Sequence, residues 1–333
     1  MVQRRESMAT SLKYTLHHYG STNYLQKVGV WEVDPSNQSK YWIVYIHGGA
    51  WRDPRVALES FAPSINHILG TSAAASGDKS GDVIAGFASI DYRLSPHPAF
   101  PQDPATTPAD EYRGARHPDH LDDVRAALVF LQRTYGFGGN YVLVGHSAGG
   151  ALAFQLLATS PSPSPSSPAS SGPSASIAAA AAAAAAHPVL PAAIVCFEGL
   201  YDFSGINARY GGAYAPFFAA AFGEEPEAWD AAAPIKFAGS YAEKWPGKSF
   251  VLLGSSPDDV LVDELEAEGM ARRLRDKDGF RELGEEGEEE ERGGENRLLW
   301  LKDLEGDHDE IWQDGEHVAR IVWIALREIG AAV

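Results

Sequence analysis

The sequence predicts an α/β protein whose mostly parallel central sheet is covered by helices on both faces. Two observations carry this prediction. Short, continuous apolar runs, typical of strands buried on both sides, alternate with segments whose apolar residues recur at helical spacing. The chain has 333 residues, of which 44% are hydrophobic, so it can bury a large core. Parallel strands joined through helices produce this alternation.

Each expected strand is a short run rich in apolar, mostly β-branched or aromatic residues. The runs are 41–46, 83–91, 141–144, 191–196, 249–253 and 298–301. Between them, residues 120–135 have a helical pattern, and Asp119 is expected to cap its start. Residues 148–158 are apolar enough for a buried helix.

Two segments have low sequence complexity. Residues 160–187 are rich in Pro, Ser and Ala and end in a polyalanine tract, and residues 277–296 are rich in Gly and Glu. Neither composition can bury enough apolar surface to offset the entropy of ordering, so we expect surface insertions without a role of their own. The prediction is a single domain, 1–333, interrupted at these two places.

Charge and cysteine content exclude several classes of partner. The formal net charge is 27 − 45 = −18 and the pI is about 5.0, a balance that repels nucleic acid and anionic membranes. Cys196 is the only cysteine, so no intrachain disulfide can form. The chain has no secretory signal pattern and no apolar stretch long enough to span a bilayer. We expect a cytoplasmic protein with a small-molecule partner.

Residues 145–149, Gly-His-Ser-Ala-Gly, fit the motif G-x-S-x-G. They follow one expected strand and precede one expected helix, the context in which this motif forms the nucleophile turn of an α/β-hydrolase. The two glycines permit the sharp turn, which exposes Ser147 at its tip. The amides of the following helix then point at developing negative charge. Ser147 is the expected nucleophile.

Residues 47–51, His-Gly-Gly-Ala-Trp, follow the strand expected at 41–46. Hydrolases of this fold carry an HGG-type loop after their third strand, whose amides complete the oxyanion hole. Glycine lets the backbone approach the reacting oxygen closely. The expected donors are the amides of Gly49, Ala50 and Ala148, and the motif includes His47, Gly48 and Trp51, of which His47 is expected to be structural.

The acid and the base follow the serine in this fold, in that order. After the strand expected at 249–253, Asp258 and Asp259 compete for the role of acid; apolar residues after Asp259 favour it, and Asp258 stays open. His308 lies in the loop after the last expected strand and is the expected base. His317 falls inside a helical pattern and is a weaker alternative. The aspartate would orient the imidazole, which takes the proton from Ser147.

His117 and His120, three positions apart and with three nearby aspartates, are candidates for a metal site. A helix start, with Pro118 in the first turn, explains the same residues, and one His pair is a weak metal signal. We expect no metal and no cofactor.

These motifs resemble those of the kynurenine formamidases, especially the fungal ones, within the hormone-sensitive-lipase-like group of α/β-hydrolases. HGGAW is the most discriminating motif, since related lipases and esterases usually carry HGGG. The likeness extends from about residue 40 to 325, outside the two insertions. It also includes the segments 91–96, 100–101, 117–124 and 199–203.

The resemblance implies hydrolysis of N-formyl-L-kynurenine to L-kynurenine and formate in tryptophan catabolism toward NAD, without a cofactor and often by a homodimer. A carboxylesterase acting on small acyl or aryl esters is the alternative enzyme. A catalytically dead ligand-binding protein is the alternative of another class. Five aromatic residues are candidates both for stacking on the substrate's ring and for the core: Trp51, Tyr201, Phe203, Tyr214 and Phe217.

Overall fold

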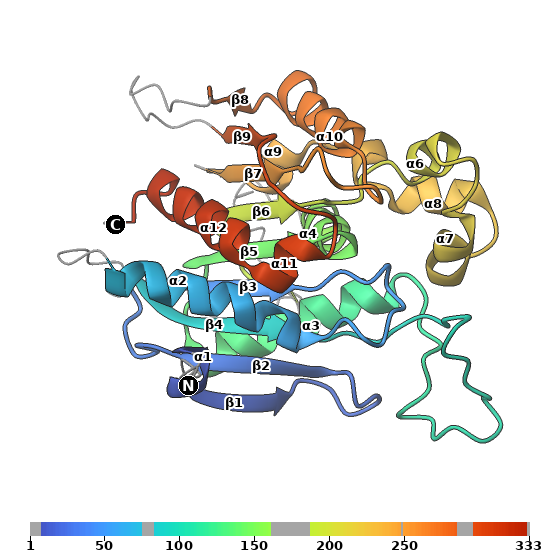
Figure 1. Ribbon diagram of the computed structural model, residues 1–333, viewed down its shortest axis with the longest axis horizontal. Helices are drawn as coiled ribbons and strands as arrows, with labels where there is room; N and C mark the ends of the chain where they lie inside the picture. The colour runs from blue at the N-terminus through green and yellow to red at the C-terminus, as the bar shows by residue number, and fades with distance from the viewer. Residues whose placement is uncertain (1–7, 75–82, 161–186, 248, 285–295, 332–333) are drawn as a thin grey trace, which may run out of the picture.

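The computed structural model describes residues 8–74, 83–160, 187–247, 249–284 and 296–331. Within these ranges, strands form one sheet in the order β1-β2-β4-β3-β5-β6-β7-β9-β8 (Figure 1). The strands are β1 (Lys13–His18), β2 (Lys27–Glu32), β3 (Tyr41–Ile46), β4 (Ile84–Ile90), β5 (Tyr141–His146), β6 (Ala193–Phe197), β7 (Phe250–Gly254), β8 (Arg281–Glu282) and β9 (Arg297–Leu301). β1 and β2 pair antiparallel, β2 joins β4 antiparallel, and every other pairing is parallel.

Helices cover both faces of the sheet. The α-helices are α1 (Met8–Ser11), α2 (Ala62–Ala74), α3 (Asp119–Tyr135), α4 (Ala148–Thr159), α6 (Phe203–Arg209), α7 (Ala215–Phe222), α8 (Pro226–Ala232), α9 (Tyr241–Lys244), α10 (Glu264–Asp276), α11 (Glu310–Asp314) and α12 (Glu316–Glu328). In the described part of the chain, the 3₁₀ turns η1 (Leu58–Phe61) and η3 (Pro234–Lys236) accompany them. α2, α11 and α12 lie on one face, α3, α4 and α10 on the other, and α6–α8 gather beyond one end of the sheet (Figure 1).

The core has two parts, one on each side of the sheet. In β3, Trp42, Val44 and Ile46 belong to the cluster under α3 and α4, while Ile43 and Tyr45 belong to the cluster under α2 and α12. Side chains alternate between the faces of a strand, so a strand buried on both faces must be apolar throughout. The continuous apolar run at 41–46 has this physical cause.

The expected fold class is confirmed, and each of the six expected strand regions overlaps a strand. The hairpin β1–β2 was not anticipated, because β1 is an edge strand with alternating exposed side chains and no apolar run. The expected cap was wrong: α3 begins at Asp119 itself, with Pro118 in the capping position. The Asp119 carboxylate accepts from the Arg116 amide at 3.1 Å and pairs with Arg93 at 3.2 Å.

Residues 161–186 and 285–295, most of the two expected insertions, lie outside the described residues, and the insertions stay predictions. β8 falls inside the second expected range, and Phe280 just before it is buried, so the fold continues into that range. None of the described helices is both long and apolar enough to cross a membrane.

The parallel strands end level with one another. Ile46 of β3 pairs with Gly145 of β5, and Gly254 of β7 pairs with both Phe197 of β6 and Leu301 of β9. The loops that follow these strands therefore meet at one edge of the sheet, where open α/β sheets bind their ligands. This edge holds the candidate site.

Candidate active site

Ser147 occupies a strained turn between β5 and α4. Its φ of 52° and ψ of −118° are unusual for a residue with a Cβ, and its amide donates to Phe197 O at 3.2 Å. Strain of this kind persists only where the surrounding structure holds it. The turn lifts the Ser147 side chain out of the sheet, between the end of a strand and the start of a helix.

The flanking glycines allow this turn because nothing larger fits. A Cβ at Gly149 would lie 2.1 Å from Ile46 O, and a Cβ at Gly145 would lie 2.6 Å from Gly149 O. Gly48 is equally confined, since its Cβ would meet His146 Nδ1 at 2.6 Å and Ser147 Cβ at 3.0 Å. The loop after β3 and the turn after β5 are therefore in direct contact.

The loop after β3 turns its backbone with three consecutive positive φ angles, 85° at Gly49, 48° at Ala50 and 60° at Trp51. Gly49 O accepts the amides of Arg52 and Asp53, both at 2.9 Å. Among the described residues, no acceptor is bonded to the amides of Gly49 and Ala50. Ala148, at the first position of α4, has an amide without an intrahelical partner. All three amides of the expected donor set are thus without a described backbone acceptor, and their role stays a prediction.

His308 and Asp259 meet between the loops after β9 and β7. His308 Nδ1 donates to Asp259 Oδ2 at 2.7 Å, and Asp259 Oδ1 accepts the amides of Leu261 and Val262 at 2.7 and 2.9 Å. Burial alone would raise the pKa of Asp259, but the hydrogen bonds from His308 and from the backbone amides hold it at about 2. Asp259 is thus an anion that holds the Nδ1 proton of His308.

The two competing aspartates have different surroundings. Asp258 is exposed, and its carboxylate accepts only a long hydrogen bond, 3.4 Å, from the Gly306 amide. The geometry therefore favours Asp259 over Asp258 as the partner of His308.

A cavity of about 220 Å³ contains both Ser147 and His308. Its walls come from the loop after β3, from α7 and from the loop after β7, and Tyr214 donates from its hydroxyl to Leu261 O to join two of these walls. Among the aromatic candidates, Trp51, Tyr214 and Phe217 line the cavity. Tyr201 and Phe203 are buried in the core and do not line it, so for these two the core interpretation holds.

Three further histidines from the sequence analysis contact groups other than the serine. His47 is buried, donates from Nδ1 to Gly48 O at 2.9 Å and stacks on Tyr92, which fits its expected structural role. His120 is buried 2.9 Å from the Ser95 hydroxyl, and burial lowers its pKa to about 3. His317 lies on α12, where its Nε2 accepts the Glu305 amide at 3.4 Å, outside the cavity with Ser147.

Glu198 is a residue of the site that the sequence interpretation missed. It follows β6 with a φ of 49°, is 2% exposed, and has one carboxylate oxygen within 4.8 Å of ligating atoms of Asp259 and His308. Burial raises the pKa of Glu198 to about 11, and the Asp259 carboxylate adds to the shift. The three side chains could ligate a cation, but the short Nδ1–Oδ2 contact needs a proton between its atoms. They are therefore a hydrogen-bonded group. The signal in the sequence was a charged residue directly after an apolar strand.

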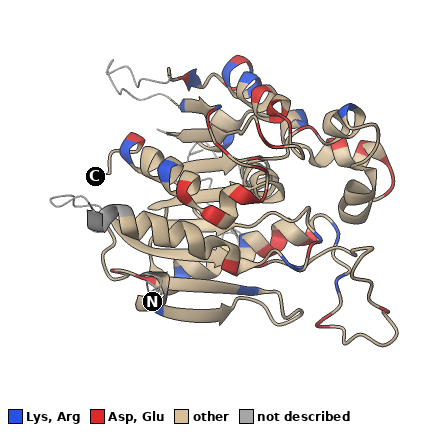
Figure 2. Ribbon diagram, viewed as in Figure 1, with Lys and Arg blue, Asp and Glu red and all other residues tan. Residues whose placement is uncertain are grey.

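Acidic residues surround this edge of the sheet. Figure 2 shows them in the loop from β7 to α10 and in the loop from β9 to α11, the two loops that carry Asp259 and His308. Arg52 and Arg55 bring positive charge to the cavity from the loop after β3. Arg55 pairs with Asp53 at 2.6 Å, so the charges of Arg55 and Asp53 compensate each other.

Two fungal proteins are similar over most of their length. The kynurenine formamidase-like hydrolase FscH of Fusarium equiseti is 32% identical over 286 residues, which cover 85% of this chain and 81% of that protein. The kynurenine formamidase AvaC of Aspergillus versicolor is 32% identical over 300 residues, which cover 84% of this chain and 86% of that protein. No protein-family model matches the chain.

Solved structures share the fold at low sequence identity. Esterase B of Lactobacillus rhamnosis HN001 superposes with a TM-score of 0.61 at 12% identity, covering 96% of this chain and 87% of that one. At this identity the likeness concerns the fold alone, and it identifies the arrangement of the sheet and its helices as the α/β-hydrolase fold.

Proposed function

Because the chain belongs to the kynurenine formamidase family, we propose that it hydrolyses N-formyl-L-kynurenine to L-kynurenine and formate, a step of tryptophan catabolism toward NAD. The hydrolase works without a cofactor. The observation that carries the proposal is the 2.7 Å contact between His308 and Asp259 at a cavity that also contains Ser147. A nucleophile and a base at one cavity, with an acid that orients the base, are the parts that acyl transfer requires.

In the first half of the reaction, His308 takes the proton of Ser147 while Oγ attacks the formamide carbon. The oxyanion receives hydrogen bonds from the amides of Gly49, Ala50 and Ala148, which have no competing backbone acceptor. His308 then gives its proton to the arylamine nitrogen, the C–N bond breaks, and the formyl group remains as an ester on Ser147. Asp259 stabilises the imidazolium that forms in between.

In the second half, a water molecule gives one proton to His308 and its oxygen attacks the formyl carbon. The C–O bond to Ser147 breaks, and the same proton returns to the serine oxygen. The product is formic acid, which gives its proton to water and leaves as formate, and the enzyme is regenerated. An arylamine leaves more readily than an alkylamine, so an ordinary serine mechanism suffices.

The assay that tests this function compares two substrates on the purified protein. We expect kcat/KM for N-formyl-L-kynurenine to exceed that for p-nitrophenyl acetate, with both activities absent from Ser147→Ala. A formamide value no better than the ester value would favour the carboxylesterase alternative. Absence of both activities, together with absence of fluorophosphonate labelling, would favour the inactive ligand-binding alternative.

Compartment and assembly are further parts of the proposal. The only cysteine, Cys196, is buried, and a chain of this size without disulfides suits a reducing compartment such as the cytoplasm. The homodimer implied by the family resemblance stays a prediction, which light scattering of the purified protein would test.

A further inference from the structure

Arg52 is a buried residue whose guanidinium forms no ion pair with any described carboxylate. Arg52 is 7% exposed as a whole residue. None of the described Asp or Glu side chains lies within ion-pair distance of its guanidinium. Its Nη1 donates to Pro216 O at 3.1 Å, and its charge lies 4.1 Å above the Phe217 ring. Its Nε is buried without a hydrogen-bond partner among the described residues. Burial therefore lowers the pKa of Arg52.

The neighbouring acid is already occupied. Asp53 accepts two hydrogen bonds from the Arg55 side chain, at 3.0 and 2.6 Å, so it is not available to Arg52. A buried charge without an opposite charge is costly, and a folded protein keeps one where a ligand supplies the missing charge. The position of Arg52 indicates which ligand this is.

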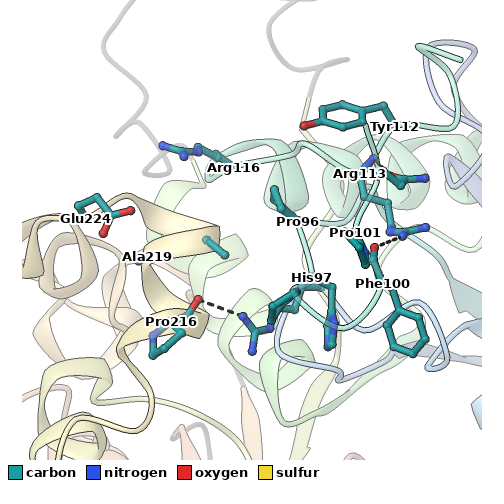
Figure 3. A pocket seen from close by; sticks show the side chains of 14 residues that line it. Pro96, His97, Phe100, Pro101, Tyr112, Arg113, Arg116, Pro216, Ala219 and Glu224 are labelled. Carbon is teal, nitrogen blue, oxygen red and sulfur yellow. Dashed lines mark hydrogen bonds between the residues drawn. The ribbon is translucent and has the colours of Figure 1, made fainter. Parts of the chain in front are cut away.

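Arg52 lies in the wall between two cavities. One contains Ser147 and His308; the other, of about 540 Å³, is shown in Figure 3, with Pro216 and Ala219 of α7 on one side and His97 and Arg113 on the other. The dashed line at Pro216 in Figure 3 is the hydrogen bond from Arg52. A molecule whose reacting carbonyl is at Ser147 can therefore extend toward Arg52.

We propose that Arg52 forms a subsite for the carboxylate of the substrate's amino-acid side chain. This inference rests on the proposed function, because N-formyl-L-kynurenine carries such a carboxylate on the chain attached to its ring. A guanidinium binds a carboxylate through two parallel N–H donors, and the contact is strong where water is excluded. The subsite distinguishes this substrate from uncharged anilides and esters that would fit the same cavity.

The test compares a charged and an uncharged formamide. In Arg52→Gln we expect kcat/KM for N-formyl-L-kynurenine to fall about 10²-fold, mainly through KM, while kcat/KM for formanilide stays within about threefold. Arg52→Lys keeps the charge without the planar pair of donors and should recover part of the loss. Arg113→Gln, in the neighbouring cavity only, is the matched control and should leave both substrates unaffected.

Equal losses on both substrates in Arg52→Gln would overturn the subsite, since Arg52 would then serve only to hold the loop after β3. A loss in Arg113→Gln confined to the charged substrate would move the subsite into the neighbouring cavity and also overturn it. If the wild-type protein hydrolyses formanilide but not N-formyl-L-kynurenine, the proposed function fails, whatever the variants do. The two failures are thus distinguishable.

A second and independent observation concerns Glu198. Both oxygens of its carboxyl group are buried without a hydrogen-bond partner among the described donors, while its amide donates to Gly254 O at 3.0 Å and fixes the backbone. Asp259 lies next to it, and no Lys or Arg of the described chain pairs with it. Two adjacent carboxylates cannot both stay ionised in such a place, so one of them keeps a proton.

The proton belongs to Glu198. Asp259 accepts hydrogen bonds from His308 and from two backbone amides, all of which stabilise its anion. Glu198 instead faces Asp259 and His308 and, at longer range, the exposed carboxylate of Glu264. A neutral Glu198 has an O–H to donate, and the Asp259 carboxylate is the acceptor within reach. We infer that Glu198 is a positioning residue, a neutral acid that holds Asp259 in place for His308.

Two substitutions separate this role from a merely structural one. Glu198→Gln keeps the size and a donor, so kcat and the acidic limb of the kcat/KM profile should stay within about threefold and a few tenths of a pH unit of wild type. Glu198→Ala removes the donor and should lower kcat about tenfold with KM unchanged. Glu266→Gln is the control. Glu266 is equally buried, but its carboxylate accepts the amides of Tyr201 and Asp202, so the substitution should not move the acidic limb of the kcat/KM profile.

Stability against pH gives a second readout. The folded protein retains a proton on Glu198 that the unfolded chain releases above the ordinary pKa of 4.5, so this group makes folding less favourable as pH rises from there toward about 11. Glu198→Gln cannot lose a proton. Its melting temperature relative to wild type should therefore rise between pH 5 and pH 9.

An acidic limb that moves down by a unit in Glu198→Gln would mean that Glu198 is ionised and would overturn the inference. So would a melting-temperature difference that does not change with pH. Hydrolysis of p-nitrophenyl acetate serves for these measurements if the formamide is not a substrate, so a failure of the proposed function does not affect this test.

Discussion

Ser147→Ala is expected to lose about 10⁶-fold in kcat on any substrate of the enzyme, because the other groups of the site act only through the serine oxygen. The substitution removes one hydroxyl from a turn whose backbone already accepts a Cβ, so the fold should be retained and the melting temperature nearly unchanged. Circular dichroism and a fluorophosphonate probe report on these two points separately.

The probe should label the wild-type protein once and Ser147→Ala not at all. Other buried serines at this edge of the sheet, such as Ser256, donate to backbone carbonyls and should not react with the probe. Labelling that survives in Ser147→Ala, or residual turnover above about one part in a thousand, would move the nucleophile to another residue and remove the basis of the mechanism.

Asp259→Asn is expected to lower kcat about 10⁴-fold, with little change in KM. The new amide oxygen can still accept from Leu261 and Val262, which leaves its NH₂ group facing His308 Nδ1. An NH₂ group needs an acceptor there, so the imidazole takes the tautomer with its proton on Nε2 and cannot receive the serine proton. The loss is thus chemical and does not require unfolding.

Asp258→Asn is the matched control, one position away. Its carboxylate is exposed and accepts only the 3.4 Å hydrogen bond from Gly306, so kcat should stay within about twofold of wild type. Similar losses in the two variants would mean that the loop after β7 tolerates neither change and that the assignment of the acid is wrong. Steady-state kinetics on both proteins decides this.

Much of the candidate site could be predicted because its motifs are local. Gly145 and Gly149 are required by contacts within a few residues and with the adjacent strand, so the turn around Ser147 leaves a compact pattern in the sequence. Strands buried on both faces leave apolar runs, and six of them were located this way. The order of serine, acid and histidine then follows from the fold.

The parts that were missed depend on contacts that are distant in the sequence. Glu198 acquires its character only from Asp259, which the pairing of β6 with β7 brings beside it. Arg52 differs from Arg55 because the Asp53 carboxylate bonds Arg55 and not Arg52. Both arginines lie close to Asp53 in the sequence, so the sequence does not show which of them it bonds. The aromatic candidates likewise divided according to tertiary packing, with Tyr201 and Phe203 in the core.

The order in which the sheet is built along the chain has a consequence for synthesis. β3 and β5 pair with each other and come from the first half of the chain, whereas the strand before His308 is the last to be made. Under the proposed mechanism, a chain still emerging from the ribosome has its serine and oxyanion loop but no base, and it remains inert. Activity begins only when β9 adds to β7, so the newly made protein cannot hydrolyse anything before its sheet is complete.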